Sequence, residues 1–276
     1  AGGQMALTEQ IDNYPGFDAG IDGFTLGEQM QRGAEHFGAE TILAEVESVE
    51  LQEPVKQLKT SEGIIMTRTV VIATGATPRP LGIPGEREWT GRGVHYCAAC
   101  DGMAYRGKTV AVIGGGNSAA EDALTLSRFA KKVYLIHRRD TLRAEKIYTK
   151  QLAEKENVEF CWNSTVEKLI CTERLTGVQL RNSKDHTMQE LLCDGIFVSV
   201  GRNPATGLLQ GQVTMDQAGY LCADETTRTN LPGVCGAGDV RTKPLRQVVT
   251  AAADGAVAAH FAAQYLNEQK IDAGVN

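Results

Sequence analysis

Two cysteines separated by two residues, Cys97 and Cys100, stand in the stretch CAACDG and are followed at once by Asp101. Pairs of this kind occur in zinc sites, haem attachment sites, small structural disulfides and dithiols that exchange electrons. Each of these sites needs different residues elsewhere in the chain. The remaining sequence therefore decides which chemistry the pair performs.

A redox dithiol fits the surrounding sequence better than the other three sites. Zinc needs four ligands, but there is no second Cys-x-x-Cys or Cys-x-x-His, and His95 supplies only a third ligand. Haem attachment needs His after the second cysteine, where this chain has Asp101. A disulfide across so short a loop removes little entropy from the unfolded chain. Asp101 is then the candidate acid or base, with a turn-forming Asp-Gly pair as the alternative.

Composition bounds the class of protein. The chain has 276 residues, 42% of them hydrophobic, which is enough for two domains with their own cores. A net charge of −6 argues against a general nucleic-acid binder, and no run of about 18 apolar residues is present to span a membrane. The start AGGQMALTEQ lacks signal-peptide features, and the other five cysteines show no disulfide spacing. We expect a cytoplasmic protein without a bound metal.

A dinucleotide-binding pattern begins 14 residues after Cys100. Gly114, Gly116 and Ala119 form G-x-G-x-x-A between the apolar strand TVAVI and a helix predicted over 118–130, and the strand KVYLIH follows. The first glycine permits a tight turn, the second lets a pyrophosphate approach the backbone, and the small third residue lets helix and strand pack closely. We also predict that Ser118 and Glu121 form a capping box at the start of this helix.

The residues after the second strand favour NADPH over NADH. An NAD-binding domain usually places an acid about 20 residues beyond the first glycine. Here the strand ends in HRRDTLR, so that His137, Arg138, Arg139 and Arg143 are available to bind a 2′-phosphate through charge-assisted hydrogen bonds. A solvated basic turn is the alternative. Because a nicotinamide normally reduces a disulfide through a flavin, a flavin cofactor is expected as well.

One sequence pattern appears twice in the chain. VVIATGATPRP and DGIFVSVGRNP are both apolar strands that stop at a glycine and run into a proline linker. We predict an α/β protein with two Rossmann-like nucleotide-binding domains, the second inserted into the first between Pro80 and about Pro204. Thr25 and Glu28 are expected to form a capping box for a helix ending near Phe37. A last strand and a long small-residue helix are predicted at the end of the chain.

The sequence resembles the low-molecular-weight thioredoxin reductases over essentially its whole length. The stretches that carry the resemblance are, in order, GGQMALTEQIDNYPGF, VVIATGATPRPLGIPGE, GRGVHYCAACDG, VAVIGGGNSAAEDALTLS, VYLIHRRDTLRAEKI, DGIFVSVGRNPAT and GVCGAGDV with LRQVVTAAADG. The resemblance implies an FAD domain made of residues 1–80 and 205–276 and an NADPH domain over residues 81–204. It also implies a homodimer that reduces thioredoxin or a thioredoxin-like protein.

The resemblance further assigns roles to matching positions. Cys100 would contact the flavin, Cys97 would attack thioredoxin, and Asp101 would manage protons. The implied FAD contacts are Gln4, Asn13, Gly238, Asp239, Arg246, Gln247 and Val248. The implied NADPH contacts are Gly114, Gly116, Asn117, Ser118, Ala119, His137, Arg138, Arg139 and Arg143.

The sequence departs from the family pattern in two places. The cysteines enclose Ala98 and Ala99 where many relatives have Ala-Thr, which should tune the redox potential without abolishing exchange. Family members also open with a strand and a G-x-G-x-x-G turn that hold the ADP half of FAD, and AGGQ follows that unit. We therefore expect either a piece of a longer protein or a chain that binds FAD poorly. Two alternatives stay open: an NADH-linked reductase of a peroxide-reducing system, and a non-catalytic NADPH-binding remnant.

Overall fold

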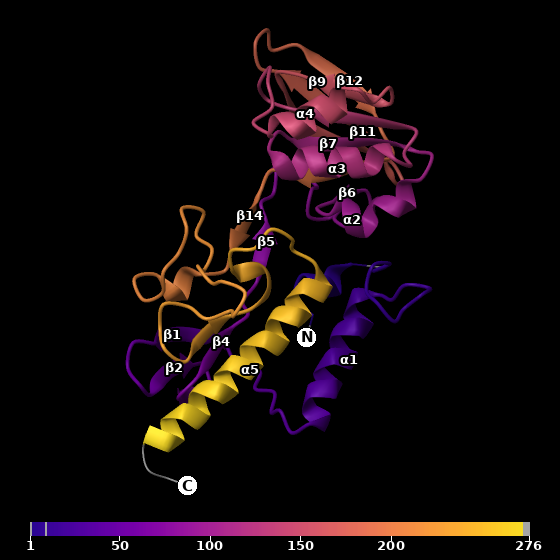
Figure 1. Ribbon diagram of the computed structural model, residues 1–276. Coiled ribbons are helices and arrows are strands. Elements are labelled where there is room, and N and C mark those ends of the chain that lie inside the picture. The colour runs from indigo at the N-terminus through magenta and orange to yellow at the C-terminus, as the bar shows by residue number, and fades with distance from the viewer. Residues whose placement is uncertain (1, 9, 273–276) are drawn as a thin grey trace. The chain divides into compact units, whose positions relative to one another are not determined.

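The computed structural model describes residues 2–8 and 10–272, and the chain divides into two compact units. The first unit contains the residues up to Glu28 together with Pro78–Gly201, and the second contains Gln29–Thr77 together with the residues from Arg202 onward. Figure 1 labels the main helices and strands of the chain. The boundaries at 77/78 and 201/202 fall close to the two predicted proline linkers. Each unit has its own buried apolar cluster.

A five-stranded parallel sheet forms the centre of the first unit, with the strand order β6-β13-β7-β8-β9. Its strands are β6 (Val94–His95), β7 (Thr109–Gly114), β8 (Lys132–Ile136), β9 (Val158–Cys161) and β13 (Gly195–Ser199). The strands are apolar almost throughout, because both faces of a parallel sheet are covered. This arrangement confirms the predicted α/β fold class.

Each face of this sheet has its own covering. The helices α3 (Asn117–Ser127) and α4 (Lys146–Ala153) cover one face, where Phe197 of β13 and Val112 of β7 pack against Ala123. On the other face, Ile196 and Ile113 pack against an antiparallel meander. The meander strands are β10 (Ser164–Cys171), β11 (Leu175–Asn182) and β12 (Met188–Leu192). Alternate residues of one strand therefore belong to two different cores.

The predicted strand-turn-helix-strand unit is present as β7, α3 and β8, but the predicted capping box of α3 is wrong. Gly116 occupies the N-cap position, where it has no side chain to cap the helix, and Glu121 accepts a hydrogen bond from the Tyr148 hydroxyl. The helix begins at Asn117, so Ser118 lies inside it and cannot act as the N-cap residue.

The first helix, α1 (Gly23–His36), also begins differently from the prediction. Thr25 lies inside the helix, and its backbone N donates to the Asp22 carboxylate at 2.9 Å. Asp22 therefore caps this end, so the predicted Thr25–Glu28 capping box is wrong.

The residues up to Glu28 lie in the first unit, whereas we grouped them with the rest of residues 1–80. Their backbone hydrogen bonds are local: Ile11 pairs with Ile21, and Gly23 donates to Thr8. Within residues 2–8 and 10–28, the structure therefore shows no strand that joins the sheets of the second unit.

The second unit is built from small sheets and one long helix. One antiparallel sheet contains three strands, β1 (Val46–Glu50), β2 (Lys56–Thr60) and β3 (Gly63–Thr67). A parallel pair is formed by β4 (Val70–Ile72) and β15 (Val234–Gly236). A further pair is formed by β5 (Ala76–Pro78) and β14 (Arg202–Pro204). The helix α5 spans Val248–Asp272, as predicted for the end of the chain. None of the helices within residues 2–8 and 10–272 has the length and apolar character needed to cross a membrane.

Short 3-10 turns complete the two units. They are η1 (Met5–Leu7), η2 (Gly102–Tyr105), η3 (Gly207–Leu209) and η4 (Gly238–Val240).

The buried carboxylate of Glu86 fixes the connection between β5 and β6. Its oxygens accept hydrogen bonds from the backbone N atoms of Leu81 and Gly82 and from the Tyr96 hydroxyl, each at 2.8 Å. Burial, together with this hydrogen bond to Glu86, raises the pKa of Tyr96 well above its usual value. One side chain thus satisfies the polar groups of a loop that precedes the cysteine turn.

We predict that Glu86→Ala lowers the free energy of unfolding of the first unit by about 2 to 3 kcal/mol, because three donors lose a charged acceptor. Both tryptophans, Trp89 and Trp162, lie in this unit, so urea unfolding followed by tryptophan fluorescence reports on it. The exposed Glu88→Ala is the matched control and should change the value by less than about 0.5 kcal/mol. Equal effects of the two variants would contradict the prediction.

Candidate active site

Cys97 and Cys100 form a disulfide on the short helix α2 (Ala98–Asp101), directly after β6. Cys97 is the N-cap residue in extended conformation, and its Sγ accepts a hydrogen bond from the Cys100 backbone N at 3.2 Å. The helical turn brings positions i and i+3 together, which places the two Cα atoms 5.3 Å apart. Both cysteines are half-buried, and Ala98 between them is buried.

Asp101 ends α2 and lies beside Cys100 in the chain. Its Oδ2 atom is 3.2 Å from Nδ1 of His95, and its side chain is 22% exposed. His95 is buried, and its Nε2 atom is 2.7 Å from the Tyr105 hydroxyl. Sequence reasoning considered His95 only as an incomplete zinc ligand and did not detect this network.

The turn after β7 requires glycine at its first position and leaves space at its third. Gly114 has a φ of +157°, and a Cβ there would lie 2.4 Å from the Ser199 carbonyl oxygen and 2.7 Å from the Ala119 Cβ. A Cβ on Gly116 would meet no atom within 4 Å. Gly116 is thus where another molecule can approach the backbone at the start of α3, with no capping side chain in the way.

The His137 ring packs against this turn. A Cβ on Gly115 would meet the His137 ring at 2.2 Å, and the Gly115 carbonyl accepts hydrogen bonds from the backbone N atoms of Arg143 and Ala144. Burial lowers the pKa of His137, and the neighbouring Arg143, Arg138 and Arg139 lower it further. Within the described residues its Nε2 atom has no hydrogen-bond partner.

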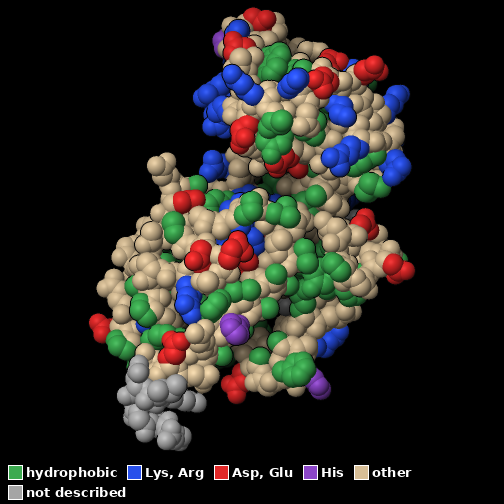
Figure 2. Space-filling view, in the orientation of Figure 1, with side chains coloured by type: hydrophobic (Ala, Val, Ile, Leu, Met, Phe, Trp, Pro, Cys, Tyr) green, Lys and Arg blue, Asp and Glu red, His purple; other side chains and the backbone are tan. Residues whose placement is uncertain are grey.

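The basic side chains near the turn are accessible. Arg138, Arg139 and Arg143 are exposed, and Lys and Arg side chains are frequent on the visible face of this unit (Figure 2). The three guanidinium groups act electrostatically on His137, so they place positive charge near the glycine turn on a chain of negative net charge.

The remaining predicted nucleotide contacts surround the same turn. Asn117 joins α3 to α4: its Nδ2 donates to Glu145 Oε1 at 2.7 Å, and its Oδ1 accepts from the Glu145 backbone N at 2.9 Å. Ser118 is exposed, whereas Ala119 is fully buried against β7. The structure therefore brings the predicted NADPH residues together, some at the surface and some as its support.

A second group of predicted residues gathers around η4 in the other unit. Burial raises the pKa of Asp239, although Arg202, 3.7 Å away, opposes this effect. The Arg246 guanidinium lies 4.1 Å from the centre of the Tyr220 ring and donates to the Asp239 carbonyl. Gly238 starts this turn, Gln247 precedes α5, and Val248 begins it.

Asp254, which sequence reasoning missed, fixes this turn to α5. Its carboxylate accepts hydrogen bonds from the Gly238 backbone N at 2.9 Å and from Lys243 Nζ at 2.7 Å, and Arg241 is 3.4 Å away. The connection spans up to 16 residues of sequence, so no local pattern marks it.

Gln4 and Asn13, the other two predicted flavin contacts, belong to the first unit. Gln4 precedes η1, and Asn13 lies between the bridged residues Ile11 and Ile21. The structure therefore assigns the predicted flavin contacts to both units.

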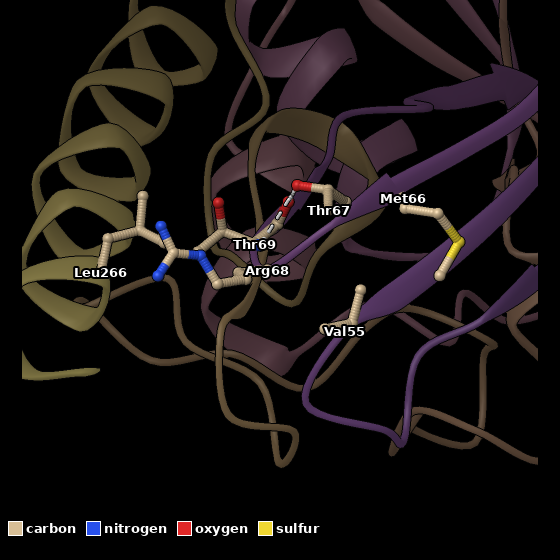
Figure 3. Close-up of a pocket in the computed structure, with 6 residues that line it drawn as sticks. All are labelled: Val55, Met66, Thr67, Arg68, Thr69 and Leu266. Atoms are coloured by element: carbon tan, nitrogen blue, oxygen red, sulfur yellow. Dashed lines mark hydrogen bonds between the residues drawn. The ribbon is translucent and has the colours of Figure 1, made fainter. Parts of the chain in front are cut away.

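The second unit also has a surface hollow of about 330 Å³ between the end of β3 and α5 (Figure 3). Thr67 donates a hydrogen bond to the Thr69 carbonyl there, and Arg68 is the one charged residue that lines the hollow. None of the predicted site residues lines it. Among residues 2–8 and 10–272, no group of three or more His, Cys, Asp and Glu side chains is placed to hold a metal ion.

Comparison with known proteins identifies one family. A family profile described as pyridine nucleotide-disulphide oxidoreductase matches residues 1–255. The thioredoxin reductase of Treponema pallidum is 42% identical over 266 residues, covering 96% of this chain and 86% of that protein. Solved thioredoxin reductases from Streptococcus pyogenes and Giardia duodenalis superpose with TM-scores of 0.88 and 0.89, at 40% and 34% identity. Each alignment covers 96% of this chain and 87% of the other.

The glycine turn makes a paired prediction. Gly115→Ala should lower the free energy of unfolding of the first unit by about 1 to 3 kcal/mol, because the new methyl group displaces the His137 ring. Gly116→Ala should change it by less than about 0.5 kcal/mol, because its Cβ enters open space. Urea unfolding by tryptophan fluorescence measures both, and a reversed order would show that the turn is packed differently.

Proposed function

This chain belongs to the pyridine nucleotide-disulphide oxidoreductase family, and we propose that its Cys97–Cys100 disulfide is the group that passes electrons to a substrate disulfide. The activity is that of an NADPH-dependent flavoprotein disulfide reductase of the thioredoxin reductase type, with FAD and NADPH as cofactors. One observation carries the assignment of the site: the two cysteines form a disulfide, and Asp101 directly follows Cys100 in the chain.

We assign NADPH to the first unit. The open space at Gly116 and the uncapped start of α3 fit a pyrophosphate, because backbone N–H groups and the helix dipole favour negative charge there. Arg138, Arg139 and Arg143 would bind the 2′-phosphate, since each guanidinium donates charge-assisted hydrogen bonds. His137 supports the turn from below, and its low pKa keeps it neutral beside these cations.

We assign FAD chiefly to the second unit. Bound FAD would accept a hydride from NADPH and deliver an electron pair to the disulfide. The residues around η4, namely Gly238, Asp239, Arg246, Gln247 and Val248, would hold it, together with Gln4 and Asn13. Asp239 and Arg246 fit a ligand with hydroxyl and phosphate groups, since the partly buried carboxylate belongs to η4 and the Arg246 guanidinium donates to the backbone carbonyl of the same residue.

The cysteines would then act in sequence. After the disulfide has taken up two electrons, the Cys97 thiolate attacks one sulfur of the substrate disulfide, and the other substrate sulfur leaves as a thiolate. Cys100 next attacks Cys97 Sγ in this mixed disulfide, which restores the Cys97–Cys100 bond and releases the second substrate sulfur. Asp101 carries the proton that one cysteine sulfur needs when the disulfide opens.

Thioredoxin or a thioredoxin-like protein is the proposed substrate, because the relatives with 40% or more identity described above are thioredoxin reductases. We further propose a homodimer in a reducing compartment such as the cytoplasm. The five remaining cysteines support this location, since all are free thiols.

The arginines give a prediction for nucleotide choice. The double substitution Arg138→Ala and Arg139→Ala should weaken NADPH binding roughly 10- to 100-fold and leave NADH binding within about twofold, because only NADPH carries the 2′-phosphate. Isothermal titration calorimetry measures both affinities. Arg128→Ala, an exposed arginine at the other end of α3, is the control, and parallel losses of both nucleotides would contradict the assignment.

The disulfide gives the direct test of the proposed function. Cys97→Ser should lower thioredoxin reduction by NADPH and FAD at least about 1000-fold, because a hydroxyl cannot form the mixed disulfide. Cys161→Ser is the matched control, since burial raises the pKa of the Cys161 thiol to about 11 and leaves it protonated. A Cys97→Ser protein that retains the activity would exclude this route.

A further inference from the structure

The buried imidazole of His95 connects the acid beside the disulfide to a buried tyrosine. We propose that His95 is a positioning residue for Asp101 in the opening and closing of the Cys97–Cys100 disulfide. The inference rests on the proposed function and adds a residue to it. Its basis is a continuous chain of hydrogen-bonding atoms from Tyr105 through His95 to Asp101, with separations of 2.7 and 3.2 Å.

Packing holds the His95 ring in one orientation. It stacks on Phe197 of the neighbouring strand β13, with centroids 5.3 Å apart and an interplanar angle of 26°. Tyr105 meets both rings edge-on, at 5.2 Å from His95 and 5.5 Å from Phe197. Tyr105 in turn lies against Gly195, where a Cβ would be 2.3 Å from its ring. A ring held by two aromatic contacts presents each of its nitrogens to one partner.

One proton arrangement satisfies all three groups. If His95 is neutral with its proton on Nδ1, that N–H donates to Asp101 Oδ2 and Nε2 accepts from the Tyr105 hydroxyl. The charged groups on the neighbouring elements are few. Lys108 Nζ lies 5.2 Å from the centre of the Tyr105 ring, and the Asp194 carboxylate accepts from the Thr109 backbone N. Gly195 and Phe197, the β13 residues in contact, carry no charge.

This arrangement holds the Asp101 carboxyl group in place both when it is protonated and when it is ionised. When the disulfide takes up two electrons, the S–S bond breaks, one sulfur remains a thiolate, and the other would take the proton of Asp101. Asp101 is then a carboxylate that accepts the His95 Nδ1–H hydrogen bond. On re-oxidation the proton returns as the S–S bond forms. His95 thereby stabilises the ionised carboxylate at one place and limits its rotation.

Two isosteric variants separate this role from simple packing. The amide nitrogen of His95→Asn can take the place of Nδ1 and still donate to Asp101, whereas that of His95→Gln takes the place of Nε2 and faces Tyr105. The readout needs no flavin: the full chain is reduced chemically, and its reaction with a small aromatic disulfide is followed from pH 5 to 9. Asp101→Asn identifies the inflection that depends on Asp101.

We expect His95→Asn to follow the unsubstituted chain within about twofold at every pH. His95→Gln should react up to about tenfold more slowly than His95→Asn in the part of the profile that depends on Asp101, because the ionised carboxylate has lost a donor. Equal profiles for the two His95 variants would overturn the inference. If Asp101→Asn alone changes the profile, only the inference fails; if Asp101→Asn changes nothing, the proton role of Asp101 fails with it.

A second measurement does not depend on any variant folding. Nitrogen-15 NMR of the histidine rings in the oxidised chain reports which ring nitrogen carries the proton. The inference requires the Nδ1–H tautomer for His95 at neutral pH, and an Nε2–H tautomer would contradict it.

Discussion

The parallel pairing of β13 with β6 on one side and with β7 on the other is the constraint on which the site depends. Ile196 pairs with both Val94 and Ala111, so the cysteine turn after β6 and the glycine turn after β7 follow strands of the same sheet. Because both faces of that sheet are buried, neither strand can slip in register without exposing an apolar core. The cysteine turn and the glycine turn therefore share one rigid support.

Neighbouring residues of similar type have different roles in this structure, because they are packed differently. Gly114 and Gly115 serve the fold, because added side chains there would meet Ser199 and His137, whereas Gly116 leaves open space for a ligand. The basic cluster shows the same difference: His137 is buried and its pKa is lowered by burial and by the nearby arginines, while those arginines are exposed. Residue type alone therefore does not show whether a residue supports the turn or is open to a ligand.

Short-range pattern explains what could be predicted from the sequence. The strand-turn-helix-strand unit and the closing helix were predicted because their apolar periodicity and glycines lie within about 30 residues. The two capping boxes failed because Asp22 and Gly116 occupy the N-cap positions instead. The partners of His95 and Asp254 could not be predicted, because tertiary packing brings them together and no spacing rule marks them.

If the Cys97–Cys100 disulfide accepts electrons in addition to the flavin, an anaerobic reductive titration will show it. The chain, supplied with one equivalent of FAD, is titrated with dithionite while the flavin absorption and free thiols are recorded. We expect four electrons for complete reduction, with two new thiols, and two electrons in Cys97→Ser, which has no disulfide to open. A titration complete at two electrons with the disulfide intact would contradict it.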